Sequence, residues 1–355
     1  MSYFNLRSQL IRMKKSLLVV GAVLAASIAS YSQKVTLTDD KAGKKVDVSV
    51  DGKPFTSYIY PGVAELKKAV LYPVRTANGT LITRGWPMDP RAGERVDHPH
   101  HVGVWLNHGN VNGYDFWNSS NAVDRTKNKY GDIIHTGISS TKSGKGKAEL
   151  TVSADWISQD GATFLKEKTT YIFRAMGDER IIDRITTLIA QEDVTFEDSK
   201  EGVFGMRMAR ELEIPSKKLE VFTDANGIAT KVASLNNEGV TGNYLNKEGV
   251  TGDDVWGKRS PWCELQGDIK GEKISVAIVD HPSNIGYPAY WHARGYGLFA
   301  VNPLGDKEFT SGKKTLNHKL KKGESMTLRY RIIVASHDLQ NSEIDGLAAD
   351  FSKVK

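Results

Sequence analysis

Apolar and polar residues alternate with a period of two along several long stretches of the chain. Thr169–Phe173 alternates in this way, a Gly-Asp turn follows within Met176–Glu179, and Ile181–Ile189 resumes a regular apolar pattern. Two such runs joined by a short turn predict a β-hairpin. Met326–Val334 also alternates, and Ile274–Val279 is typical of a strand buried on both faces. The pattern favours antiparallel sheets.

Helical patterns are weak by comparison. Val63–Val70 could form two helical turns, and Ser342–Phe351 could form a short C-terminal helix. No glycine-rich loop stands between a strand and a helix, which argues against a dinucleotide-binding fold. The sequence therefore predicts an all-β fold, a large antiparallel β-sandwich with few short helices. We expect residues 34–355 to form a single domain, with Ser234–Trp256 as a loop insertion at the surface.

The first 33 residues have the pattern of an export signal. Four basic residues precede a short apolar run from Leu17 to Ala29, and small residues follow. The apolar run is shorter than the roughly 20 residues that a membrane-spanning helix needs. We expect cleavage near Ser32–Lys34 and a mature protein that is periplasmic or secreted, with no membrane span. Met1 and Met13 are both possible starts.

Removal of the leader changes the charge of the chain. The whole sequence has a formal net charge of +6, which falls to +2 without the four basic residues of the leader. No cluster of basic residues with interleaved aromatics remains, so nucleic acid is not expected as a partner. Cys263 is the only cysteine, which excludes an internal disulfide and a thiolate-based structural zinc site.

Four of the nine histidines lie between Asp97 and His108. Imidazole nitrogens need partners when they are buried, so such a cluster favours a functional site over simple packing. If a strand begins at His101, then His101, Trp105 and Asn107 share one face and the intervening apolar residues share the other. Asp97 is close enough in sequence to fix the tautomer of an imidazole.

Other segments of the chain supply residues that suit a sugar-binding site. Indole and phenol rings stack on the apolar faces of sugars, while fixed donors and acceptors bind the hydroxyls. One segment carries Lys200 and Glu201 next to a glycine, and another places Tyr290, His292 and Arg294 on one strand face. We predict His101, His292, Glu201 and His100 as catalytic residues. The predicted substrate-binding residues are Arg84, Trp105, Asn107, Trp117, Lys200, Tyr290 and Arg294.

A metal centre is the main chemical alternative. His98, His100 and His101 offer imidazoles that would suit zinc, iron or copper. The sequence has no His-Glu-x-x-His motif, and short matches to a two-histidine, one-carboxylate pattern arise easily inside any histidine cluster. No Gly-x-Ser-x-Gly motif supports a serine hydrolase. We therefore expect no cofactor, with a transition metal at these three histidines as the alternative.

Four motifs together resemble a known bacterial family. They are Asp97-His98-Pro99-His100-His101-x-Gly103-x-Trp105, Asn112-Gly113-x-Asp115-Phe116-Trp117, Lys200-Glu201-Gly202-x-Phe204-Gly205 and Tyr290-Trp291-His292-x-Arg294-x-Tyr296-Gly297. In these motifs the chain resembles the uncharacterised family labelled "methane oxygenase PmoA". A particulate methane monooxygenase subunit is a bundle of membrane helices, and the sequence predicts none after the leader. The resemblance therefore does not imply methane oxidation.

A second and more distant resemblance concerns the chemistry. The long antiparallel strands and the closing segment from Gly323 to Arg331 are similar to proteins of the galactose-mutarotase type, which have a β-supersandwich fold. In that superfamily a histidine and a carboxylate act at the anomeric centre of a sugar. The resemblance implies that His101 or His292 is the acid and that Glu201 is the base.

Three functions remain open at this point. The first is an exported carbohydrate-active enzyme that acts on a sugar or sugar derivative by histidine and carboxylate acid–base chemistry, as an epimerase, lyase or hydrolase. The second is a metal-dependent oxygenase or hydrolase that uses the histidine cluster. The third is a non-catalytic glycan-binding module. Each has a small molecule or an oligosaccharide as its partner.

Overall fold

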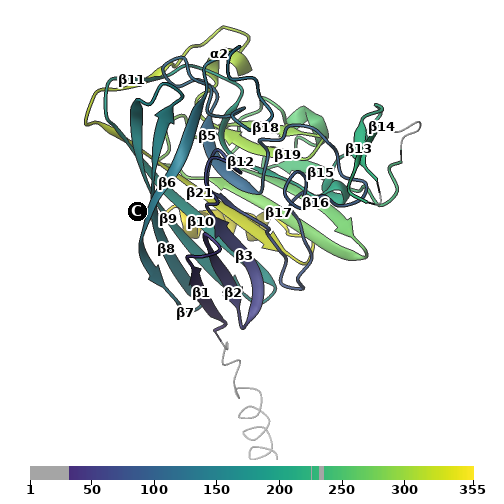
Figure 1. The fold of residues 1–355 in the computed structure, drawn as a ribbon. Coiled ribbons are helices and arrows are strands. Elements are labelled where there is room, and N and C mark those ends of the chain that lie inside the picture. The colour runs from purple at the N-terminus through teal and green to yellow at the C-terminus, as the bar shows by residue number, and fades with distance from the viewer. Residues whose placement is uncertain (1–31, 225, 232–235) are drawn as a thin grey trace, which may run out of the picture. The chain divides into compact units, whose positions relative to one another are not determined.

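Two large antiparallel sheets make up most of the protein, as a computed structural model shows (Figure 1). The structure describes residues 32–224, 226–231 and 236–355, and Gln33–Lys355 forms one compact unit. The predicted leader falls almost wholly outside the described residues. The all-β fold with large antiparallel sheets and few short helices is confirmed.

The first sheet has nine strands in the described residues, and it carries the histidine-rich segment. Its strands, in spatial order, are β18 (Tyr290–Arg294), β19 (Leu298–Asn302), β12 (Gly202–Arg207), β5 (Val104–His108), β4 (Val70–Leu71), β3 (Lys53–Ile59), β2 (Lys45–Val50), β1 (Lys34–Asp40) and β7 (Gly144–Lys145). Strands β12 and β5 are neighbours, and β18 and β19 follow at the same end of the sheet. Segments some 200 residues apart in sequence are therefore brought together.

The second sheet has eight strands in the described part of the chain. They are β15 (Asn243–Asn246), β16 (Trp262–Ile269), β17 (Glu272–Asp280), β21 (Ser325–Ala335), β10 (Glu179–Ala190), β9 (Thr163–Met176), β8 (Lys147–Ser158) and β6 (Gly131–Lys142). The predicted hairpin is β9 and β10, with the turn at Gly177 and Asp178. The predicted strands Ile274–Val279 and Met326–Val334 lie within β17 and β21.

Short elements complete the fold. Strand β11 (Val194–Phe196) pairs with β20 (His318–Leu320), and β13 (Val221–Thr223) pairs with β14 (Ala229–Lys231). The helices are η1 (Arg210–Leu212), η2 (Gly252–Val255), α2 (Asp306–Phe309) and α3 (Asn341–Phe351). The predicted C-terminal helix is α3, which starts with a capping box between Gln340 and Glu343.

The core lies between the inner faces of the two sheets. Phe204 of β12 stacks on Tyr330 of β21 with ring centroids 4.9 Å apart, and Phe55 of β3 meets Phe173 of β9 edge to face. Val104 of β5 belongs to this core. Burial of such apolar surface stabilises the sandwich by roughly 25 cal/mol per Å².

Two predicted elements differ from the structure. Val63–Val70 contains turns and the first residue of β4 in place of the predicted helix, and the carbonyl oxygen of Lys67 accepts a hydrogen bond from the Ile133 N–H. The described part of Ser234–Trp256, residues 236–256, contains edge strand β15 and helix η2 and is not a simple loop.

Strand β5 begins at Val104 rather than at His101. Gly103 has φ of 56°, and a Cβ atom there would lie 2.2 Å from the carbonyl oxygen of Leu71, so a side chain is excluded. This turn breaks the expected alternation. Val102 therefore does not share a face with Val104. It packs with Trp105 in a cluster separate from the inner core.

Candidate functional site

The histidine-rich loop before β5 is held in shape by Arg84. The Nη1 of Arg84 donates hydrogen bonds to the carbonyl oxygen of Asp97 at 2.9 Å and to Asp97 Oδ1 at 2.5 Å. Its Nη2 donates to the carbonyl oxygens of His98 and His101 at 3.0 and 3.1 Å. The Arg84 side chain is only 1% exposed. Arg84, which the sequence predicted to bind substrate, uses these donors to position the loop.

Asp97 is the electrostatic centre of the loop. Its Oδ1 also accepts a hydrogen bond from Arg207 Nη2 at 2.6 Å, and its Oδ2 lies 3.1 Å from His98 Nδ1. Burial alone would raise the pKa of Asp97, but Arg207, His98 and Arg84 outweigh it and hold the pKa well below the usual range. As the sequence suggested, Asp97 lies where it can fix the tautomer of an imidazole, which is that of His98.

Four rings form a continuous stack that runs inward from the surface. Tyr296, His98, His101 and Trp105 lie nearly parallel, with successive ring centroids 5.0, 4.8 and 5.1 Å apart. The His98 side chain is 40% exposed, whereas His101 is 1% exposed. His98 has φ of 44°, a region that non-glycine residues rarely occupy. Such strained positions cluster at functional sites. The imidazole that a substrate can reach is thus that of His98.

His100 and His101 are enclosed beneath this surface. Burial lowers the pKa of His100 to about 2 and that of His101 far below its ordinary value, so both rings are neutral. Arg207 Nη1 lies 3.3 Å from His101 Nδ1 and donates to it, while the Nε2 atoms of both histidines are buried without a partner. His100 and His101, which the sequence predicted as catalytic residues, are both buried.

His292 lies beside the stack and meets the same tryptophan as His101. The Trp117 ring stacks on His292 at 6.4 Å and meets His101 edge to face at 5.6 Å. His101 and His292 thus both contact Trp117. His292 Nδ1 lies 2.7 Å from the carbonyl oxygen of Lys200. A carbonyl oxygen can only accept, so Nδ1 carries the proton and Nε2 has the lone pair.

The Nε2 atom of His292 has no hydrogen-bond partner within the described residues. His292 is only 3% exposed, but its Nε2 is not among the fully buried polar atoms without a partner, which include Nε2 of His100 and His101. Burial of the ring lowers the pKa of His292 to about 3. His292 is consequently a neutral imidazole whose free nitrogen is a proton acceptor.

The loop before β12 carries Glu201 directly after Lys200, whose carbonyl oxygen contacts His292. The carbonyl oxygen of Lys200 accepts hydrogen bonds from Asn302 Nδ2 at 3.0 Å and from the Gly202 N–H at 3.1 Å, in addition to the contact with His292. Glu201 follows directly, and its side chain is one quarter exposed. Burial raises the pKa of Glu201, and the charges of Lys200, His98 and Arg294 lower it in part. The imidazole and the carboxyl group are thereby fixed by one peptide.

Three other predicted binding residues are fully buried. Trp105 and Trp117 have no exposed surface, and they support the histidine rings from below. Asn107 is likewise buried, and its Nδ2 donates to the carbonyl oxygen of Phe116 at 2.7 Å. These three side chains, which the sequence predicted to bind substrate, are enclosed by the protein. They hold the site in place.

The face of β18 carries Tyr290, His292 and Arg294, as predicted, while Trp291 lies in the core on the other side. Tyr290 stacks on Phe309 with centroids 4.9 Å apart and is mostly buried. Arg294 is exposed, and its guanidinium lies 5.3 Å from the Trp256 ring. Of the predicted binding residues, Lys200 and Arg294 are the ones with exposed charged groups next to His292.

The alternative metal site does not assemble. His98 and His101 stack face to face. The nitrogen lone pairs lie in the planes of the rings, so this stacking does not direct them toward a common point between the rings. Among the described residues, no three side chains of His, Cys, Asp or Glu are arranged to hold a metal ion. The ligand set His98, His100 and His101 is therefore not supported by the geometry.

Sequence reasoning missed three residues of the site. Arg207 pairs with Asp97, Tyr296 covers His98, and Lys68 donates to the carbonyl oxygen of His100 at 2.8 Å. Burial lowers the pKa of Lys68 to about 7. A usable signal existed for Arg207, because an arginine inside the apolar run of β12 must find a buried partner.

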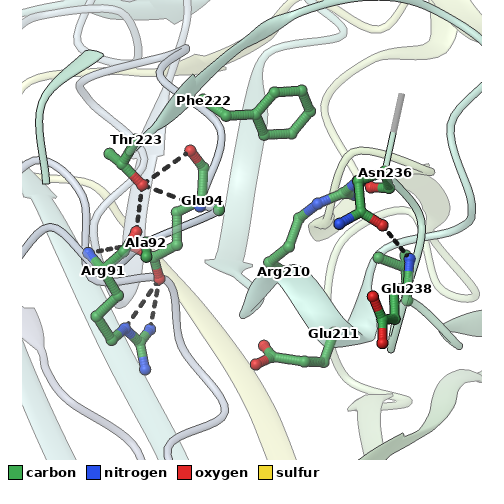
Figure 2. A pocket seen from close by; sticks show the side chains of 11 residues that line it. Arg91, Ala92, Glu94, Arg210, Glu211, Phe222, Thr223, Asn236 and Glu238 are labelled. Carbon is green, nitrogen blue, oxygen red and sulfur yellow. Dashed lines mark hydrogen bonds and ion pairs between the residues drawn. The ribbon is translucent and has the colours of Figure 1, made fainter. Parts of the chain in front are cut away.

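A separate pocket of about 360 Å³ contains none of these residues (Figure 2). Its buried polar groups are already satisfied, since the Glu94 carboxylate accepts from the N–H groups of Gly85 and Trp86, and Arg210 Nη1 donates to Glu213. Phe222 lies against the guanidinium of Arg210. Nothing in this arrangement points to a ligand.

The chain matches a family model over residues 45–349, and the model is described as a family of unknown function, DUF6807. A comparison with curated proteins found no match. Within the described residues, no helix is long and apolar enough to cross a membrane.

Several solved structures are similar at low identity. The galactosidase domain of an alpha-galactosidase-sucrose kinase is 8% identical with a TM-score of 0.38, covering 85% of this chain and 42% of that chain. A GH36 alpha-galactosidase from Geobacillus stearothermophilus is 11% identical with a TM-score of 0.39, covering 86% and 41%. A galactose mutarotase related enzyme from Lactobacillus acidophilus is 9% identical with a TM-score of 0.30, covering 86% and 98%. The chain spans about two fifths of the length of the two galactosidase chains.

Proposed function

The chain belongs to the DUF6807 family of unknown function, and from the chemistry of its own site we propose that it is a carbohydrate-active enzyme that transfers protons to and from a sugar. His292 and Glu201 are the acid–base pair, and His98 is the exposed ring beside them. The methane-oxygenase label stays a resemblance and contributes nothing to this proposal.

One observation carries the proposal. The Lys200 carbonyl oxygen holds His292 Nδ1 at 2.7 Å, and Glu201 is the next residue along the chain. A neutral imidazole with a free Nε2 is thereby tied to the residue that precedes Glu201, whose carboxyl group has a pKa raised by burial. A proton donor and a proton acceptor that differ in this way are what acid–base catalysis at a sugar hydroxyl requires.

The two groups differ in their pKa directions. Burial lowers the pKa of His292 to about 3, so its Nε2 starts without a proton. Burial raises the pKa of Glu201 from its ordinary value. The pH profile of kcat/KM distinguishes which of the two is the acid in the forward reaction. The chemistry uses side chains alone, and epimerases, lyases and hydrolases can all employ it.

Exposed rings beside the pair suit a sugar. Tyr296 and His98 present a stacked edge at the surface, and aromatic groups of this kind pack against sugar C–H faces. The N-terminal segment, with its basic residues and apolar run, supports export of the protein to the periplasm or beyond. N-terminal sequencing of the mature protein tests export, with an expected start near Lys34.

The experiment for activity is a panel of reducing sugars, glycosides and oligosaccharides followed by NMR. We expect turnover of at least one sugar by the wild type, and loss of turnover in Glu201→Gln and His292→Gln with unchanged circular dichroism. Binding of a sugar without turnover would identify a glycan-binding module. Activity that depends on a stoichiometric metal, removed by a chelator, would favour the metal-dependent alternative.

A further inference from the structure

The guanidinium groups around Asp97 leave the site with excess positive charge. Arg84 and Arg207 both donate to Asp97 Oδ1, so one carboxylate faces two cations. The second guanidinium nitrogen of Arg207 lies on neutral His101, which adds no negative charge. Charges that remain unbalanced near a low-dielectric surface attract counter-ions.

Two other acidic residues near these cations are engaged within the protein. Buried Glu213 faces Arg207, but its Oε2 accepts hydrogen bonds from Arg95 Nε and Arg210 Nη1, both at 2.6 Å. Asp115 accepts hydrogen bonds from the N–H groups of Trp117 and Asn118 and from Asn118 Nδ2. It also faces buried Lys68, whose pKa it raises in part. Asp115 is therefore engaged within the protein. Glu201 is the remaining carboxyl group next to the exposed cations.

Two exposed cations flank Glu201 and His292. Lys200 Nζ lies 3.8 Å from Glu201 Oε1, and the Lys200 side chain is 52% exposed. Arg294 lies two residues after His292 on the same face of β18. Its guanidinium forms no hydrogen bond or ion pair with any described residue and only covers the Trp256 ring at 5.3 Å.

The two cations act on the same groups. The charges of Lys200 and Arg294 both lower the pKa of Glu201 and the pKa of His292. Arg294 therefore lies within electrostatic range of both members of the acid–base pair, and its five N–H donors have no protein acceptor among the described residues. A guanidinium in this state binds carboxylate, phosphate or sulfate in a two-point contact.

We propose that the substrate is an anionic sugar, whose negatively charged group binds to Arg294 and Lys200 while the sugar ring faces His292 and Glu201. This inference rests on the proposed function, because it names the class of sugar that the same pair acts on. The anion is a carboxylate, phosphate ester or sulfate ester, all of which fit the donors of arginine. The neutral sugar lacks this contact.

Calorimetry with matched sugars tests the inference on the full mature chain. The probes are glucose and galactose, the corresponding glucuronic and galacturonic acids, glucose 6-phosphate and glucose 6-sulfate. We expect at least one anionic probe to bind about tenfold or more tightly than its neutral counterpart. The probe that binds best identifies the anionic group. Its affinity should fall as salt increases from 50 to 300 mM.

Variants connect the preference to the two cations. Arg294→Gln and Lys200→Gln should each weaken binding of the anionic probe by roughly tenfold and leave the neutral sugar unchanged. Lys168→Gln removes an exposed charge from β9 on the other sheet and should change neither affinity.

The outcomes separate this inference from the proposed function. Equal binding of neutral and anionic sugars, or a preference that survives both substitutions, overturns the inference that the substrate is anionic. Turnover of a neutral sugar would in that case still support the proposed enzymatic function. If an anionic sugar binds tightly through Arg294 but is never converted, the inference holds and the proposed enzymatic function is rejected. Failure of every anionic probe to bind overturns the inference.

Discussion

His292 Nδ1 and the carbonyl oxygen of Lys200 are 2.7 Å apart, and this contact joins β18 to the loop that carries Glu201. It fixes the tautomer of His292 and the direction of its free Nε2, and it ties the ring to the residue that precedes Glu201. Asn302 reinforces the same carbonyl oxygen from β19. The acid–base pair thus depends on backbone geometry as much as on side-chain identity.

The first prediction concerns the acid–base pair. Glu201→Gln keeps the size and hydrogen bonding of the side chain but cannot donate or accept the proton, so kcat should fall by roughly 10²- to 10⁴-fold. In His292→Gln, kcat should fall by a similar factor. Steady-state kinetics with the sugar found in the panel measures both. The thermal unfolding midpoint of Glu201→Gln should stay close to that of the wild type, because Glu201 is partly exposed and makes no short hydrogen bond. Full activity in either variant rejects the pair.

The second prediction distinguishes the exposed histidine from the enclosed one. His98→Ala removes the accessible ring and should reduce kcat/KM by roughly tenfold or more. His101→Phe keeps a ring between His98 and Trp105, so kcat/KM should remain within about threefold of the wild type. The reverse order of effects would show that His101 Nε2 takes part in the chemistry and that the enclosed ring opens to substrate.

The difference between these two histidines marks the limit of what the sequence predicts. Period-two alternation identified the β9–β10 hairpin, because the apolar or polar character of each residue there indicates which face of the sheet it lies on. The same rule failed at His101, because Gly103 has positive φ and turns the chain before β5 starts. Which imidazole reaches the surface depends on that single turn.

The partners of the loop could not be predicted for a different reason. Arg207 lies 110 residues from Asp97, and the carbonyl oxygen that fixes His292 belongs to Lys200, 92 residues away. Contacts over such separations are set by strand order, and one sequence does not specify which strands are neighbours. The motifs did identify the segments that meet, but not the atoms through which they meet.

The third prediction concerns Arg84. Arg84→Met leaves the carbonyl oxygens of His98 and His101 without their donor, and it removes one of the two cations on Asp97. Loss of one partner from such a buried network should lower the free energy of unfolding by about 3–5 kcal/mol. Arg84→Lys should not restore the stability, since an ammonium cannot reproduce the fork of donors.

Urea unfolding monitored by tryptophan fluorescence measures these changes. Arg75→Lys is the matched control, because Arg75 donates near the surface to the carbonyl oxygen of Gly79 alone. Its substitution should change stability by no more than about 0.5 kcal/mol. If Arg84→Met is as stable as Arg75→Lys, the loop is not held by Arg84.

The fourth prediction is a loss of stability in mild acid. Burial lowers the pKa of His100 to about 2, of His292 to about 3 and of His108 to about 4, against roughly 6.5 in the unfolded chain. Below pH 6.5 the unfolded chain therefore binds protons that the folded protein does not, so the free energy of unfolding falls as pH falls. Each such histidine contributes up to roughly 1.4 kcal/mol per pH unit. Asp280, whose pKa burial raises to about 7, opposes them over the range from about 7 to 4.

The free energy of unfolding, measured with urea at pH 7, 6 and 5, should therefore decline steeply as pH falls, because the effect of several histidines outweighs that of Asp280. His108→Gln can still donate to the Glu197 carbonyl oxygen and should make the decline shallower by one proton. His337→Gln is the control. Asp178 raises the pKa of His337, so the stability it contributes is complete below pH 6.5 and is lost only as pH rises above that value. Its removal should leave the slope of the free energy of unfolding between pH 6 and 5 unchanged. A free energy of unfolding that is constant from pH 7 to 5 would contradict the burial of neutral imidazoles on which the site depends.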